Sequence, residues 1–197
     1  MIVLNIFSTP LYITNINIGK EEHDYVIANR NNSKQNLFGN FVSNSSYVLN
    51  NSIFDNINTQ IMHHIKEYSE SVFGYSSKLK ITTSWVTYNP KNTSQHTHNH
   101  RNSILGGVMY FSENPSPICF FKNEFNQIVP DKLKHTEYNS NSYAVNCNYG
   151  MLILFPSELT HGVEINNNEH DRISLAFNTF YTGSIGSELM ANKLEFN

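Results

Sequence analysis

The sequence predicts a mainly β fold with helices in its N-terminal part, arranged as a double-sheet jelly roll. Two observations lead to this prediction. Before about residue 77, apolar side chains recur at helical spacing, and after it short runs rich in Val, Ile, Tyr, Phe and Thr alternate with Asn, Pro and Gly. A sheet of many short strands with a helix to cover one face is typical of a jelly roll.

The clearest predicted helix covers residues 51–74. Its apolar residues recur at steps of three and four: Ile53, Ile57, Ile61, Ile65, Tyr68 and Val72. Asn51 or Ser52 can cap its start, and Gly74 can end it. We expect an amphipathic helix that packs on a flat surface. A shorter helix is expected over "KEEHDYVIAN", residues 20–29.

The second half of the chain supplies the predicted strands. They cover residues 78–88, 104–111, 117–123, 142–148, 150–156, 161–166 and 172–181. We expect one domain, in which residues 1–77 are a helical support, residues 78–182 the β core and residues 183–197 a C-terminal tail. An immunoglobulin-like sandwich is the structural alternative, and it would leave the histidines described below without an explanation.

Composition excludes some partners and favours one compartment. The formal charge of −3 and the pI of about 6.3 do not favour a nucleic acid or an anionic membrane partner. Cys119 and Cys147 lie in apolar runs and are too few for a disulfide framework, which favours the cytoplasm. No apolar run approaches the length of a membrane span, and the first residues lack a basic leader.

The stretch "QHTHNH", residues 95–100, places three of the nine histidines at alternate positions. In an extended backbone such side chains share a face, so they can converge on one metal ion or form only a polar loop. A metal site needs a further ligand from elsewhere, and His161, at the head of a predicted strand, is the candidate. Glu158 and Glu164 flank His161 and are interpreted as solvated residues, with a carboxylate ligand as the less favoured alternative.

The strand 172–181 offers a second functional feature. Alternation sends Ile173, Leu175 and Phe177 to one face and Arg172, Ser174, Ala176 and Asn178 to the other. A buried arginine needs an anionic partner, and this strand has no carboxylate to provide it. A bound carboxylate ligand would satisfy the guanidinium in bidentate fashion.

Taken in order, five segments resemble a known family: "SWVTY", "HNHRNS", "GGVMYF", "LFPSELTHGV" and "RISLAFN". They are similar to the iron(II)- and 2-oxoglutarate-dependent oxygenases found in marine bacteria and their phages, which are related to the prolyl 4-hydroxylases. The opening "IFSTPLYI" and the long helix also resemble this family, so the resemblance covers most of the chain. It implies a cupin-like double-stranded β-helix.

The resemblance also implies an activity and its residues. His98, His100 and His161 correspond to the metal ligands and catalytic centre, Arg172 to the arginine that binds the far carboxylate of 2-oxoglutarate, and Ser174 to the serine of an Arg-x-Ser pattern. The implied cofactors are Fe(II), the co-substrate 2-oxoglutarate and O2. The implied reaction is hydroxylation of an unidentified protein or small-molecule substrate, in the cytoplasm of the cell or of a phage host.

One residue departs from the wider superfamily and leaves alternatives open. That superfamily uses two histidines and a carboxylate, whereas His100 stands at the carboxylate position here, so the site should hold iron(II) more weakly. Alternatively, His96 and His98 are the ligands and His100 supports them or contacts substrate. A cupin-type metalloenzyme that does not use 2-oxoglutarate, and an inactive binding or structural module, are the alternative functions.

Other residues near the motifs receive structural interpretations. Trp85 is expected to fill core space beside the metal strands. Tyr88 and Tyr110 are expected to pack on strands with their hydroxyls at the rim, and a hydrogen bond to a ligand carboxylate is the less favoured alternative. Gly106 and Gly107 indicate either a close approach or bulge beside the cavity, or a bend for packing. The remaining histidines are expected at the surface: His23, His63, His64, His135 and His170.

Overall fold

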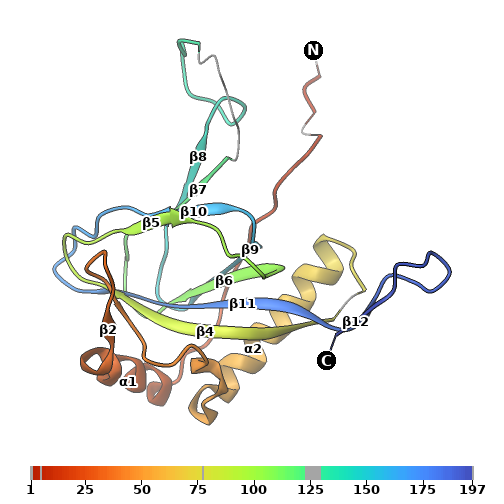
Figure 1. Ribbon diagram of the computed structural model, residues 1–197. Helices are drawn as coiled ribbons and strands as arrows, with labels where there is room; N and C mark the ends of the chain where they lie inside the picture. The colour runs from red at the N-terminus through yellow and green to blue at the C-terminus, as the bar shows by residue number, and fades with distance from the viewer. Residues whose placement is uncertain (1, 5, 77, 123–129, 197) are drawn as a thin grey trace.

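The computed structural model describes residues 2–4, 6–76, 78–122 and 130–196. These residues form two sheets that pack face to face, with helices on the outer side of the larger sheet (Figure 1). The larger sheet has the order β1-β9-β6-β11-β4-β3-β2, with β12 paired to β11, and the smaller one has the order β5-β10-β7-β8. The fold is therefore the predicted double-sheet jelly roll.

The strands have the following bounds: β1 Tyr12–Asn15, β2 Lys34–Gln35, β3 Phe41–Val42, β4 Lys78–Asn89, β5 Gln95–His98, β6 Leu105–Tyr110, β7 Ile118–Phe121, β8 Ser142–Val145, β9 Met151–Pro156, β10 Thr160–Val163, β11 Arg172–Ile185 and β12 Leu194–Phe196. All seven predicted strands are present. The range 1–77, expected to be helical support, also contributes β1, β2 and β3 to the larger sheet. These strands have two to four residues, too few for a period-two pattern to show in the sequence.

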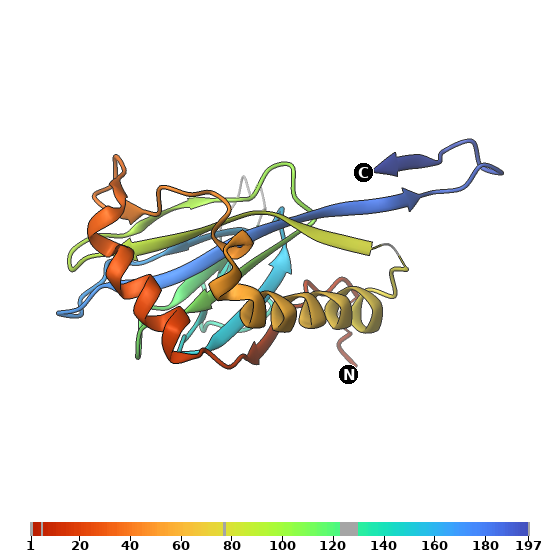
Figure 2. The same ribbon diagram turned by 90° about the horizontal axis from the view of Figure 1, so that it is seen from below.

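Two helices cover the outer face of the larger sheet, as Figure 2 shows. The shorter is α1, Lys20–Ala28, and the longer is α2, Asp55–Glu67, followed by a π-helical turn over Tyr68–Val72. The long predicted helix is confirmed. A short 3-10 turn, Ser52–Phe54, precedes it, and the Asn51 side chain caps that turn by accepting a hydrogen bond from the Ile53 backbone N–H at 3.1 Å.

The long central strand β11 separates two environments. Its neighbours are β4 on one side and β6 on the other. Ile173, Leu175 and Phe177 belong to the core shared with the helices, as alternation predicted. Arg172 and Ser174, on the opposite face, point into the space between the sheets, where they line a cavity. The β11 strand thus carries the hydrophobic core on one side and polar chemistry on the other.

The state of the two cysteines and the lengths of the helices bear on the expected compartment and on membrane spans. Cys119 and Cys147 are both buried and free. No helix among the described residues is long and apolar enough to cross a membrane.

Candidate metal centre and adjoining cavity

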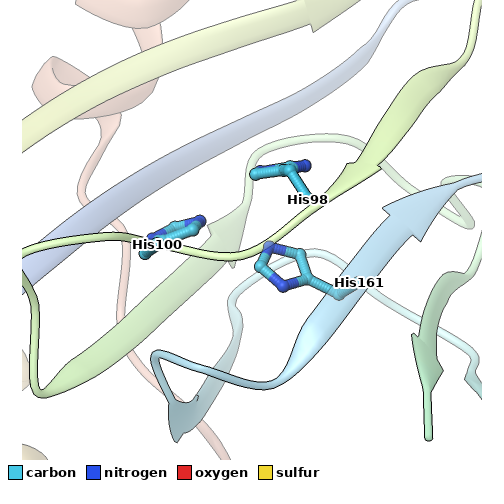
Figure 3. Close-up of side chains that lie close together, drawn as sticks. All are labelled: His98, His100 and His161. Atoms are coloured by element: carbon cyan, nitrogen blue, oxygen red, sulfur yellow. The ribbon is translucent and has the colours of Figure 1, made fainter. Parts of the chain in front are cut away.

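Three histidines converge between the sheets (Figure 3). His98 ends β5, His161 lies in β10, and the two are direct partners in the antiparallel pair. His100 follows β5, where its backbone N–H donates to the Ser157 carbonyl at 2.9 Å. One ring nitrogen from each histidine lies within 4.8 Å of the others. Two adjacent strands and the loop that follows one of them thus bring together three side chains that could hold a metal ion.

All three imidazoles use Nδ1 for a hydrogen bond within the protein. Nδ1 of His98 is 2.8 Å from the His96 carbonyl, and Nδ1 of His161 is 2.9 Å from the Leu159 carbonyl. Nδ1 of His100 is 2.5 Å from Oδ1 of Asn178. A carbonyl or amide oxygen only accepts, so each Nδ1 carries the proton and each Nε2 keeps its lone pair for a metal.

Burial keeps these imidazoles neutral. It lowers the pKa of His98 and of His100 below the usual 6.5, and it lowers the pKa of His161 to about 3. The hydrogen bonds from Nδ1 act in the opposite direction and are outweighed. Since a metal binds the neutral imidazole, the three residues are in their ligand form at neutral pH.

His96 does not join this group, although alternation placed it on the same face. His161 pairs with His98 and Val163 pairs with Gln95, so β5 has one more residue than β10 over this stretch. This β-bulge shifts by one residue which side chains of β5 face inward, so Gln95 instead of His96 lines the cavity. The His96 ring is exposed and stacks on Phe38 with centroids 4.4 Å apart.

Neither neighbouring carboxylate enters the site. Among the described residues, the metal-ligating group contains only histidines. Glu164 is exposed and accepts a 3.8 Å hydrogen bond from Sγ of Cys119, away from the three imidazoles. Glu158 is exposed in the turn between β9 and β10. The solvated interpretation of both residues agrees with these positions.

A cavity extends from the histidines along the inner face of the larger sheet. The five residues singled out in the sequence all line it: His98, His100, His161, Arg172 and Ser174. Trp85 also lines it, with its ring centroid 5.7 Å from that of His100. Trp85 was expected to fill core space. Thr87 and Asn89 lie on the same face of β4 as Trp85 and also line the cavity. No sequence motif indicated these two residues.

Arg172 is the second chemical feature of the cavity. It is 3% exposed, its Nε donates to the Ser116 carbonyl at 3.0 Å, and its Nη1 donates to Oγ of Ser174 at 3.3 Å. Its Nη2 donates to the Tyr110 hydroxyl at 3.3 Å. No described carboxylate forms an ion pair with this guanidinium. Because a buried charge without a counter-charge is costly, the site favours a bound anion.

The expectation that the hydroxyls of Tyr88 and Tyr110 lie at the rim was wrong, because both are buried and hydrogen-bonded. The fully buried Tyr110 meets Arg172, and burial raises the pKa of its hydroxyl well above 10, so the phenol stays neutral. Tyr88 faces the helices instead, where its hydroxyl donates to the Val26 carbonyl at 2.7 Å. Tyr88 is three residues after Trp85 on β4, so alternation of side chains along the strand places it on the opposite face of the sheet.

Gly106 and Gly107 both meet close neighbours. A Cβ atom on Gly106 would lie 2.7 Å from the Phe155 ring and 3.3 Å from Nδ1 of His100. A Cβ atom on Gly107 would lie 2.1 Å from the Phe177 ring, on the helix side. The pairing of β6 is regular through both glycines, so close approach and not a bulge is the reason for them.

Part of the chain matches a known protein family. Residues 83–178 match the family described as "Putative 2OG-Fe(II) oxygenase". This part of the chain, slightly less than half of its length, is similar to that family and contains His98, His100, His161 and Arg172. The match agrees with the resemblance to oxygenases that use iron(II) and 2-oxoglutarate. No curated protein matches its sequence.

Solved structures of similar fold include 2OG-Fe(II) oxygenases. A 2OG-Fe(II) oxygenase family oxidoreductase from Burkholderia pseudomallei has TM-score 0.57 and 11% identity, covering 86% of this chain and 83% of that chain. HygX from Streptomyces hygroscopicus, with nickel, 2-oxoglutarate and hygromycin B bound, has TM-score 0.59 and 12% identity, covering 87% and 82%. A Pseudomonas putida prolyl-4-hydroxylase has TM-score 0.58 and 13% identity, covering 88% and 92%.

Proposed function

We propose that this protein is an oxygenase that holds iron(II) through Nε2 of His98, His100 and His161 and binds the far carboxylate of 2-oxoglutarate through Arg172 and Ser174. One observation carries the proposal. Three unprotonated ring nitrogens within 4.8 Å of one another share a cavity with a buried arginine that has no described carboxylate partner. A metal chelated by a keto acid with a charged tail would satisfy both features at once.

The donor set fits iron. Imidazole nitrogen suits iron among other transition metals, and three protein ligands leave coordination positions for other groups. Iron(II) with 2-oxoglutarate and O2 supplies the oxidising power for hydroxylation of a carbon–hydrogen bond. Because all three ligands are neutral, the site carries one less negative charge than a site with two histidines and a carboxylate, and it should bind iron(II) more weakly.

The chain's own residues position the reactants. The Nδ1 hydrogen bonds hold the imidazoles in one tautomer, and Arg172 fixes the tail of the co-substrate in a buried pocket. Trp85 and Phe155 form apolar walls beside the histidines and limit the access of water. The substrate, a protein or a small molecule, would reach the metal from the side of the cavity that these residues leave free.

Two features support further parts of this proposal. The formal charge of −3 supports a substrate other than nucleic acid. The two buried free cysteines support a reducing compartment such as the cytoplasm. The alternative of a cupin-type enzyme without a keto acid gives the buried Arg172 no anion to bind.

An anaerobic titration tests the proposal. Metal-free protein is given iron(II) and then 2-oxoglutarate, and the visible charge-transfer band of a chelated keto acid is recorded. The band should form, should be lost in His98→Ala and His161→Ala, and should need about a hundredfold more 2-oxoglutarate in Arg172→Ala. Iron binding without a band would favour the cupin-type alternative. Absence of metal binding would favour an inactive module.

A further inference from the structure

The Asn89 side chain is buried in the cavity without a hydrogen-bond partner. It ends β4, lines the cavity with Arg172 and is 1% exposed. Neither its Nδ2 nor its Oδ1 has a partner. A buried amide usually satisfies its donors and acceptor, and leaving them unpaired costs folding free energy.

Other buried asparagines show that the fold can satisfy such groups. Asn166 donates from Nδ2 to the Asn89 and His170 carbonyls, and its Oδ1 accepts from the Asn168 backbone N–H. Asn40 lacks a partner only at Oδ1. Within the described part of the chain, Asn89 is the buried side chain with both polar atoms unpaired. An unpaired amide that lines a functional cavity points to a ligand that completes it.

The strand register places Asn89 at the arginine end of the cavity. Asn89 is the direct partner of Arg172 across β4 and β11, and Trp85 is the partner of Ala176 nearer the histidines. Directly opposite side chains on one face of an antiparallel pair have Cβ atoms about 5 Å apart. Arg172 uses three of its five N–H groups within the protein, which leaves others for an oxygen acceptor.

We propose that Asn89 is a further binding residue for the far carboxylate of 2-oxoglutarate. Its Nδ2 donates to that carboxylate, and its Oδ1 accepts a remaining N–H of Arg172 and so orients the guanidinium. The inference rests on the proposed function above. It makes Asn89 a specificity residue, because a keto acid without a second carboxylate would leave both the amide and the guanidinium unsatisfied.

Asn89→Leu removes the polar atoms at similar volume and tests this role. Binding is measured by anaerobic calorimetry on iron(II)-loaded protein with two probes, 2-oxoglutarate and pyruvate, which lacks the far carboxylate. The Kd for 2-oxoglutarate should rise about tenfold or more, and the Kd for pyruvate should not change. The Tm of the metal-free variant should equal or exceed that of the natural protein, because an unpaired amide is removed.

Thr179→Val is the matched control. Thr179 is fully buried and lies outside the cavity, with Oγ1 hydrogen-bonded at 3.0 Å both to the Leu105 backbone N–H and to its carbonyl. This variant should lower the Tm and leave 2-oxoglutarate binding unchanged. Asn89→Asp is a second test, since its carboxylate would pair with Arg172 and should weaken 2-oxoglutarate binding by a hundredfold or more while iron(II) binding is kept.

The outcomes separate this inference from the proposed function. If natural protein binds iron(II) but not 2-oxoglutarate, the proposed function fails and the role of Asn89 fails with it. If natural protein binds 2-oxoglutarate and Asn89→Leu binds it equally well, only the role of Asn89 is overturned. Equal weakening for both probes, or a Tm loss like that of Thr179→Val, would make Asn89 a structural residue and would also overturn the inference.

Discussion

At the residue scale, the candidate metal site is built from three neutral imidazoles. The three imidazoles donate from Nδ1 to carbonyl or amide oxygens and not to carboxylates. No acidic side chain is among the described residues that line the cavity, and Arg172 adds a positive charge at its other end. The cavity with a divalent metal would therefore favour a doubly negative ligand by charge alone.

The buried His161 should make the metal-free protein sensitive to acid. Its folded-state pKa of about 3 lies below the unfolded value near 6.5, so only the unfolded state takes up this proton as the pH falls below 6.5. The stability is present above that pH and is lost toward pH 3. His161→Gln should reduce the loss between pH 7 and pH 5 by about 2 kcal/mol.

Urea unfolding of metal-free protein at these two pH values measures the effect. His170→Gln is the control, because His170 is exposed and lies outside the cavity. An equal pH dependence in His161→Gln and the natural protein would contradict the prediction.

Asn178 should tune the metal affinity through His100. Its Oδ1 accepts from Nδ1 of His100, and its Nδ2 donates to Oγ1 of Thr83 at 3.0 Å. Asn178→Ala should weaken metal binding about tenfold to a hundredfold, because the ring loses the contact that fixes its tautomer and orientation. Asn178→Asp keeps an acceptor and should bind metal at least as well as the natural protein.

Metal titrations measure the metal affinity of both variants. Thr83→Val is the control, because it removes only the hydrogen bond between Asn178 and Thr83. A weakening in Asn178→Asp as large as in Asn178→Ala would show that the acceptor at this position does not matter.

At the scale of the elements, the two glycines of β6 should have separable roles. Gly107→Ala forces a methyl group against Phe177 in the helix-side core and should cost about 2 kcal/mol of stability with little effect on metal affinity. Gly106→Ala pushes Phe155 and His100, and it should lower the metal affinity as well. Chemical denaturation and metal titration of both variants check this, and equal metal affinities would contradict it.

The elements also show where sequence patterns succeed and where they stop. Period-two alternation in β11 correctly assigned the faces of Ile173, Leu175, Arg172 and Ser174, because that strand pairs regularly over residues 172–178. The same rule failed for His96, because a bulge is a property of two paired strands and leaves no mark in either sequence alone. Asn89 was missed because its importance depends on the residue opposite it, which only the register reveals.

At the scale of the whole molecule, the candidate metal site connects the two sheets. His98 and His161 belong to the smaller sheet, and His100 is hydrogen-bonded to Asn178 of the larger sheet. A bound ion would therefore join the two layers. The fold class could be predicted from the sequence. The contact between His100 and Asn178 could not, since the two residues are far apart in the chain.

Metal binding should therefore stabilise the entire fold. Iron(II) at a hundred times its Kd, added anaerobically, should raise the free energy of unfolding by about 2.7 kcal/mol, because the unfolded chain does not assemble the three imidazoles. Thermal unfolding with and without metal measures this. His98→Ala should abolish the shift, and a shift of natural size in that variant would place the ion elsewhere.

The bulge in β5 also sets how many positions on the ion stay available for chemistry. If β5 paired regularly with β10 from His98 onward, His96 would stand opposite Val163 on the cavity face; the extra residue gives that position to Gln95. A fourth imidazole would compete with the keto acid and with O2 for the coordination sphere. One additional backbone residue thus separates a site that stays open to reactants from one that its own protein would fill.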